Sequence, residues 1–276
     1  MTNEIGVKIN KQLLNIKTNL TFYKVGQGIP ILLIHGNGFD SSVWTEVADK
    51  LSRYFTVYSI DRNGFGGSKA KVTEGKIYSQ QQATDILDFI ETEINEPTVI
   101  VGWSSGALFS FQAVLADNKH FIKQIISFEA PYLASSNSDF YTVKQFIKIL
   151  FLQFFNKKIE AAEKFIKLVL QKTDNTNSFD NFTNKMKHTF ENNSTSTLAE
   201  IKSRTGEDID KLKLADIRIK IDFITGELSP KFIKSANSRL AKIFPNGLWR
   251  QIDNCGHFAL VEEPEKFAEI VRQLAK

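Results

Sequence analysis

Residues 98–111 read TVIVGWSSGALFSF, and this stretch changes character in its middle. Four β-branched residues come first, the pattern Gly-x-Ser-x-Gly follows, and an apolar run typical of a helix ends it. The pentapeptide alone recurs by chance, so the predicted strand before it and the predicted helix after it carry the argument. A serine on such a sharp turn holds its hydroxyl clear of the sheet. Ser104 is therefore a candidate nucleophile.

A serine nucleophile needs a base, and His257 is the best candidate. It stands in the sequence QIDNCGHF, in a loop beyond a predicted strand at Leu248–Ile252. The other histidines lie in less suitable places: His35 at a strand turn, His120 at a polar helix end and His188 in a helical region rich in Lys and Asn. Only His257 has the loop position that a base needs.

Four segments in this order resemble the α/β-hydrolase family over most of the chain. An apolar strand precedes HGNG at residues 35–38, a second strand precedes DRNGFGGS at residues 61–68, and the Ser104 turn comes next. His257 is then followed by EEPE at residues 262–265 and a predicted closing helix. The resemblance implies an α/β fold: a mostly parallel twisted sheet flanked by helices, with a helical cap inserted.

The resemblance also implies an oxyanion hole, since acyl transfer needs two fixed N–H donors for the developing negative charge. The backbone amide of Ser105, directly after the nucleophile, is one donor. The amide of Asn37, after His-Gly, is the other, and the Asn37 side chain is an additional candidate.

The acid that orients the histidine departs from the commonest family pattern. The family usually carries an aspartate three residues after the glycine that ends a late strand, and here Ser229 occupies that position after Gly226. Glu129 is one substitute, because it ends the predicted strand QIISFEAP, where relatives such as haloalkane dehalogenases carry an acid. Glu227 is the alternative. We prefer Glu129, since its apolar neighbours indicate a buried strand end where a carboxylate needs a partner.

Serine at the turn, rather than the aspartate of haloalkane dehalogenases, favours acyl chemistry. The sequence predicts a serine hydrolase that cleaves a small or medium carboxylic ester, thioester, lactone or amide through an acyl-enzyme on Ser104. Two alternatives stay open: a cofactor-free lyase or C–C bond hydrolase on the same scaffold, and a non-catalytic ligand-binding receptor. The expected partner is a small-molecule substrate with an acyl group.

Strands alternate with helices from Ile31 to Asp117, which predicts a parallel sheet, and an antiparallel edge is expected at Ile5–Asn10 and Leu20–Val25. The alternation stops between residues 132 and 212, where three helical patterns follow one another. We therefore expect a hydrolase core of residues 1–131 and 213–276 and a helical cap of residues 132–212. The phenylalanines of this cap are expected mostly to pack between cap and core, and Phe151 and Phe155 are candidates for lining an acyl pocket.

Composition excludes several classes of protein. The chain has 276 residues, is 42% hydrophobic, carries a net charge of +4 and has no basic run interleaved with aromatics, so no nucleic-acid partner is expected. No secretion signal or membrane-spanning run is apparent, and Cys255 is the only cysteine. We expect a cytoplasmic monomer or homodimer with no membrane partner, no cofactor and no metal.

Overall fold

One twisted sheet forms the centre of the molecule. In the computed structural model, which describes residues 10–13, 20–68, 76–133, 140–203, 209 and 211–275, eight strands form this sheet in the order β1-β2-β4-β3-β5-β6-β7-β8. The strands from β4 to β8 in this order are parallel, and β1 and β2 add an antiparallel edge. The predicted α/β fold is confirmed. The strands are β1 (Asn10–Leu13), β2 (Thr21–Val25), β3 (Ile29–Ile34), β4 (Phe55–Ile60), β5 (Thr98–Trp103), β6 (Ile122–Phe128), β7 (Lys220–Gly226) and β8 (Trp249–Ile252).

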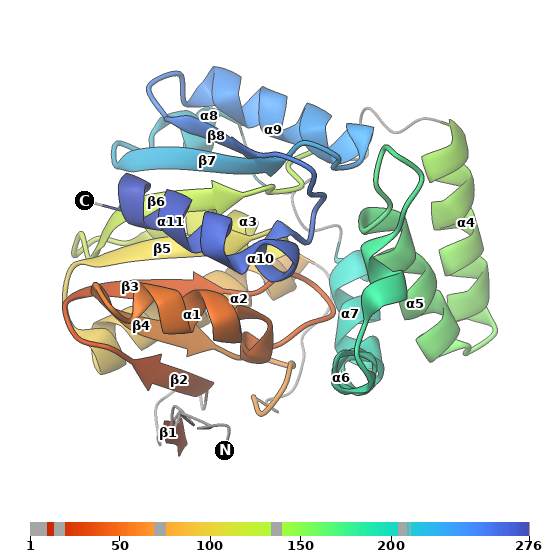
Figure 1. Ribbon diagram of the computed structural model, residues 1–276, viewed down its shortest axis with the longest axis horizontal. Coiled ribbons are helices and arrows are strands. Elements are labelled where there is room, and N and C mark those ends of the chain that lie inside the picture. Colours follow the sequence, from red (N-terminus) through yellow and green to blue (C-terminus); the bar gives the residue numbers. More distant parts are fainter. Residues whose placement is uncertain are drawn as a thin grey trace, which may run out of the picture.

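Helices cover both faces of the sheet because the inner strands are apolar on both sides. The five strands from β3 to β7 in sequence are almost continuously buried. One face packs against α1 (Thr45–Leu51), α10 (Ala259–Glu262) and α11 (Pro264–Leu274) (Figure 1). The other packs against α2 (Lys76–Phe89), α3 (Ser105–Ala116), α8 (Lys211–Ala215) and α9 (Lys231–Ile243).

Four of the helices that stand between β6 and β7 in the described chain lie beyond the carboxyl ends of the parallel strands (Figure 1). We call α4 (Phe140–Phe154), α5 (Lys158–Val169), α6 (Asn184–Asn192) and α7 (Ser194–Lys202) the inserted helices. Their buried side chains, such as Ile149, Ile166 and Leu198, join the same apolar cluster as α1 and α11. The insertion thus packs against the end of the sheet where ligands of open α/β folds bind. The predicted division into a core and a cap stays a prediction.

Several expected element boundaries shift. The first edge strand begins at Asn10, and most of the expected Ile5–Asn10 strand lies outside the described residues. After α2 the chain continues in a π-helical turn at Ile90–Ile94, which is closed by Asn95 in the left-handed conformation. α7 was not expected as a separate helix, since STSTLAEIK lacks a strong apolar stripe. None of these shifts moves a candidate site residue.

No helix within the described residues combines the length and apolar character that crossing a bilayer requires.

Candidate active site

Ser104 occupies the turn between β5 and α3 in a backbone conformation that few residues adopt. Its φ is 55° and its ψ is −124°, and its N–H donates to the carbonyl of Phe128 at 2.8 Å. Glycines on both sides leave room for this turn. A Cβ on Gly102 would lie 2.6 Å from Cα of Ala107, and one on Gly106 would lie 2.6 Å from the carbonyl oxygen of Ile34. The turn therefore has the strained geometry of a nucleophile elbow.

His257 lies in the loop after β8 and is 2% exposed. The indole N–H of Trp103 donates to the His257 carbonyl at 2.9 Å, and the two rings lie 5.6 Å apart between centroids. The ring of Phe128 lies 6.0 Å away on a neighbouring strand. Trp103 thus packs against the histidine loop. The imidazole therefore lies against two aromatic rings, and one of them belongs to Trp103, the residue before Ser104.

Glu129 supplies the carboxylate that contacts His257. Nδ1 of His257 lies 2.7 Å from Oε2 of Glu129, and the N–H of Gly226 donates to Oε1 at 2.9 Å. Glu129 is fully buried and has a φ of 52°, an unusual conformation for a glutamate. An ionised carboxylate only accepts hydrogen bonds, so in this pair the ring donates from Nδ1 to Oε2.

Glu227, the alternative acid, points elsewhere. Its Oε2 accepts the N–H of Asn254 at 2.8 Å, and the residue is half-buried at the end of β7. Ser229, at the family's usual acid position, is fully buried. Of the two glutamates, the structure therefore brings Glu129 to the histidine.

The sheet register explains why these groups meet. Trp103 pairs with Phe128 across β5 and β6, so Ser104 and Glu129 are the next residues along two adjacent strands. Glu129 in turn reaches across to β7 through Gly226 and to the loop after β8 through His257. Carboxyl ends of parallel strands lie at one edge, and this edge gathers all three groups.

The two predicted oxyanion donors lie beside Ser104. Asn37 and Ser105 are both buried, and a Cβ on Gly36 would lie 3.0 Å from Cβ of Ser104. Among the described residues, neither backbone N–H has a hydrogen-bond acceptor. The side chain of Asn37 is engaged differently, because its Nδ2 donates to the Thr197 carbonyl on α7 at 3.2 Å. The backbone amides are free to bind an oxyanion, whereas the amide side chain ties this loop to the inserted helices.

Comparison with known proteins supports the family suggested by this geometry. Residues 29–264 match the family model described as alpha/beta hydrolase fold. The chain belongs to the α/β-hydrolase family.

Curated relatives of this α/β-hydrolase include two named pimeloyl-[acyl-carrier protein] methyl ester esterase. The one from Legionella pneumophila is 22% identical over 262 residues, which cover 94% of this chain and 100% of that protein. The one from Vibrio campbellii is 29% identical over 120 residues, 44% of either chain, so less than half of that relative's length is matched. Both are named as esterases of a methyl ester.

Solved structures show the same fold. A carboxylesterase from Bacillus subtilis superposes with a TM-score of 0.74 at 15% identity, covering 98% of this chain and 92% of that chain. A thermophilic esterase from Thermogutta terrifontis gives a TM-score of 0.72 at 18% identity, covering 96% and 97%. At such identities the likeness concerns the fold of the α/β-hydrolase alone.

The two phenylalanines that were candidates for lining an acyl pocket do not face the site. Phe151 and Phe155 lie on the outer side of the inserted helices, 62% and 55% exposed, so the expectation that they line an acyl pocket is wrong. The α4 sequence is apolar on nearly every face, and its pattern could not tell the inner side from the outer. Buried rings lie closer to the site. Phe39, Phe182 and Phe258 contact one another, with centroids 5.2 to 5.8 Å apart.

A buried charged cluster next to the elbow was not predicted. Arg62 forms an ion pair with Glu200 of α7 at 2.9 Å, and both side chains are almost wholly buried. The hydroxyl of Tyr78 also donates to Glu200 at 2.9 Å. Arg62 further donates to the His35 carbonyl and lies 3.5 Å from Oγ of Ser105. Burial, followed by the negative charge of Glu200, raises the pKa of Tyr78 well above its ordinary value.

The Cys255 thiol is not activated as a nucleophile. Burial raises the pKa of the Cys255 thiol to about 11, which keeps it protonated near neutral pH. Within the described ranges, no three His, Cys, Asp or Glu side chains gather as metal ligands.

Proposed function

We propose that this chain is a serine hydrolase that cleaves small or medium carboxylic esters through an acyl-enzyme on Ser104. The observation that carries the proposal is the buried His257–Glu129 pair at 2.7 Å, beside a serine on a strained strand-to-helix turn. Curated relatives named as methyl ester esterases support an ester as the substrate class.

The reaction proceeds in two steps, acylation of Ser104 and hydrolysis of the acyl-serine. Nε2 of His257 takes the proton of the Ser104 hydroxyl while Oγ attacks the ester carbonyl, and the amides of Asn37 and Ser105 stabilise the oxyanion. The imidazolium then protonates the leaving alcohol as the C–O bond breaks, which leaves an acyl-serine. Water, deprotonated by the same nitrogen, attacks this ester and releases the acid and the free serine.

Glu129 acts on the histidine rather than on the substrate. Its Oε2 fixes the proton on Nδ1 and stabilises the imidazolium, while its Oε1 is anchored by Gly226. The buried rings of Phe39 and Phe258, which contact Trp103 next to Ser104, favour a substrate with an apolar acyl or alkoxy group.

Turnover of p-nitrophenyl acetate, butyrate and octanoate tests the proposal. We expect measurable kcat for at least one ester, and a loss of at least about 10³-fold in Ser104→Ala. The matched control is Ser110→Ala, because Ser110 lies within α3 and its hydroxyl donates to the Gly106 carbonyl of the same helix. A folded wild-type protein without esterase activity, or a Ser104→Ala variant with normal activity, would refute the proposal.

A further inference from the structure

The outer face of α4 is apolar where a surface helix is ordinarily polar. Phe140, Ile147, Phe151 and Phe154 are 84%, 61%, 62% and 84% exposed, and α4 stands at the outer edge of the molecule (Figure 1). The opposite face packs against the protein through the buried Ile149 and the half-buried Phe146 and Leu152, and it also carries Thr142 and Gln145. Apolar side chains therefore lie on both faces of α4, whereas a surface helix ordinarily keeps them on its inner face.

Aromatic side chains concentrate at the carboxyl end of this helix. The rings of Phe151 and Phe155 lie 4.6 Å apart between centroids, and those of Phe154 and Phe155 lie 5.3 Å apart. All three residues are more than half exposed. These rings pack on one another at the surface and not in the core.

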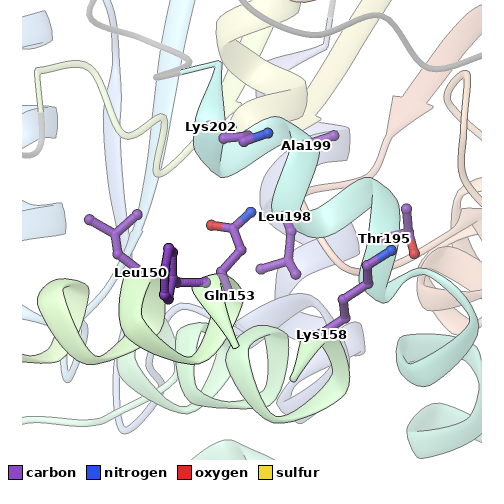
Figure 2. A pocket seen from close by; sticks show the side chains of 8 residues that line it. Leu150, Gln153, Lys158, Thr195, Leu198, Ala199 and Lys202 are labelled. Atoms are coloured by element: carbon purple, nitrogen blue, oxygen red, sulfur yellow. The ribbon is translucent and has the colours of Figure 1, made fainter. Parts of the chain in front are cut away.

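A groove of about 460 Å³ extends the apolar face from α4 onto α7. Figure 2 shows its lining, with Leu150 and Gln153 on α4 opposite Leu198 and Ala199 on α7. Lys158 and Lys202 also belong to the lining. The outer face of α4 together with this groove is called the α4 face below.

The charge of the α4 face has one sign. Residues 140–159 contain four lysines and no aspartate or glutamate. Lys157 pairs with Glu160, whereas Lys144, Lys148 and Lys158 have no acidic partner among the described residues. Long lysine side chains can lay their stems on apolar surface and extend their ammonium groups to anionic partners.

We propose that the α4 face binds the surface of a membrane that contains anionic lipids. Exposed aromatic and aliphatic side chains next to lysines are the composition of helices that lie in the bilayer interface. A second copy of the chain fits less well, because a two-fold contact would bring lysines of like charge together. The lack of a membrane-spanning run led us to expect no membrane partner. A helix that lies on the membrane surface, however, does not require a spanning segment.

This surface lies one helix away from the candidate active site. Leu198 lines the groove on α7, and the carbonyl of its neighbour Thr197 accepts the side chain of Asn37 in the oxyanion loop. Membrane contact at the α4 face therefore holds the inserted helices, and the site beneath them, close to the lipid surface.

Vesicle flotation tests the proposal without reference to catalysis. We expect the wild-type protein to float with vesicles of equal parts phosphatidylcholine and phosphatidylglycerol, and less with phosphatidylcholine alone. Lys144→Gln/Lys148→Gln should weaken the partition coefficient about 25-fold, at about fivefold per lysine. Phe151→Ser/Phe154→Ser should weaken it at least about tenfold. The matched control, Lys231→Gln/Lys242→Gln, removes two exposed lysines from α9 and should bind as the wild type does.

The substituted phenylalanines are exposed, so the variant should keep its unfolding midpoint and its turnover of a soluble ester. If the wild-type protein does not float with the vesicles that contain phosphatidylglycerol, the proposal is overturned. Equal flotation of the wild type and all variants would also overturn it. A wild-type dimer in sedimentation velocity that Phe151→Ser/Phe154→Ser dissociates would also overturn it, because the face would then be a contact between copies.

Discussion

Glu129 uses its two carboxylate oxygens for two different purposes. Oε2 accepts a hydrogen bond from Nδ1 of His257 at 2.7 Å, and Oε1 accepts one from the backbone N–H of Gly226 at 2.9 Å. Glu129→Gln keeps the shape of the side chain but removes the charge that stabilises the imidazolium. We expect kcat for a p-nitrophenyl ester to fall by roughly 10³ to 10⁴.

Glu227→Gln is the matched control for this substitution. Glu227 accepts the Asn254 amide and does not contact His257, so kcat should stay within a few-fold of the wild type. Near-normal turnover in Glu129→Gln, or a larger loss in Glu227→Gln, would show that the orienting acid is assigned to the wrong glutamate.

His35 gives the protein a predictable sensitivity to acid. Burial, with the nearby positive charge of Arg62, lowers the pKa of His35 well below its ordinary value of 6.5. Its Nε2 accepts the Arg62 amide at 2.9 Å, which requires the neutral ring. Below pH 6.5 the unfolded chain binds a proton here that the folded chain does not, so stability falls as pH falls.

Between pH 7.5 and 5.5, protonation of His35 in the unfolded chain should lower the free energy of unfolding by at most about 1.4 kcal/mol. Urea denaturation at the two pH values measures it, with His35→Gln as the comparison. The difference between wild type and variant should shrink as pH falls. An equal pH dependence in both proteins would mean that His35 does not contribute.

At the scale of elements, the β5–turn–α3 unit depends on contact between backbones. A Cβ on Gly106 would lie 2.6 Å from the Ile34 carbonyl and 2.7 Å from that of His35, and neither backbone group can move cheaply. Gly106→Ala should therefore lower the free energy of unfolding by about 1 to 3 kcal/mol despite the higher helix propensity of alanine.

Gly256→Ala, in the loop before His257, is the control for Gly106→Ala. The three atoms nearest to its added Cβ all belong to the flexible side chain of Lys172. Its urea midpoint should lie close to the wild-type value. If Gly106→Ala unfolds at the same urea concentration as the wild type, the close approach of α3 to β3 is not a constraint.

The elements near Ser104 were predictable because each has a strong local signal. β5 is an unbroken β-branched run before glycine, and the alternation of strands and helices indicated the parallel sheet. The inserted helices were harder. The apolar pattern of α4 identifies a helix but not its inner side, which is why Phe151 was expected to face the core or a pocket although it faces outward.

At the scale of the whole molecule, a buried ion pair joins the inserted helices to the sheet. Arg62 after β4 and Glu200 on α7 lie 2.9 Å apart, and the hydroxyl of Tyr78 reaches the same oxygen. Glu200 lies on a helix that the sequence did not predict, so its pairing with Arg62, 138 positions away, was not expected, whereas Ser104 and His257 follow predicted strands. The predicted site was therefore limited to groups that strand ends bring together.

Glu200→Ala leaves Arg62 buried without its carboxylate, so the free energy of unfolding should fall by about 3 to 5 kcal/mol. Glu160→Ala is the matched control on the same insertion, because its pair with Lys157 is exposed and should change stability by at most about 0.5 kcal/mol. Equal urea midpoints for the two variants would mean that the Arg62–Glu200 pair does not hold the insertion on the sheet.

His257 is proposed to activate the hydroxyl of Ser104, and covalent labelling with a fluorophosphonate tests this role. Mass spectrometry of the folded wild-type protein should show one adduct, located on Ser104 by peptide mapping. Ser104→Ala should show none, and His257→Gln should react at least about 10³-fold more slowly. An unlabelled wild-type protein, or an adduct on a different serine, would contradict the account.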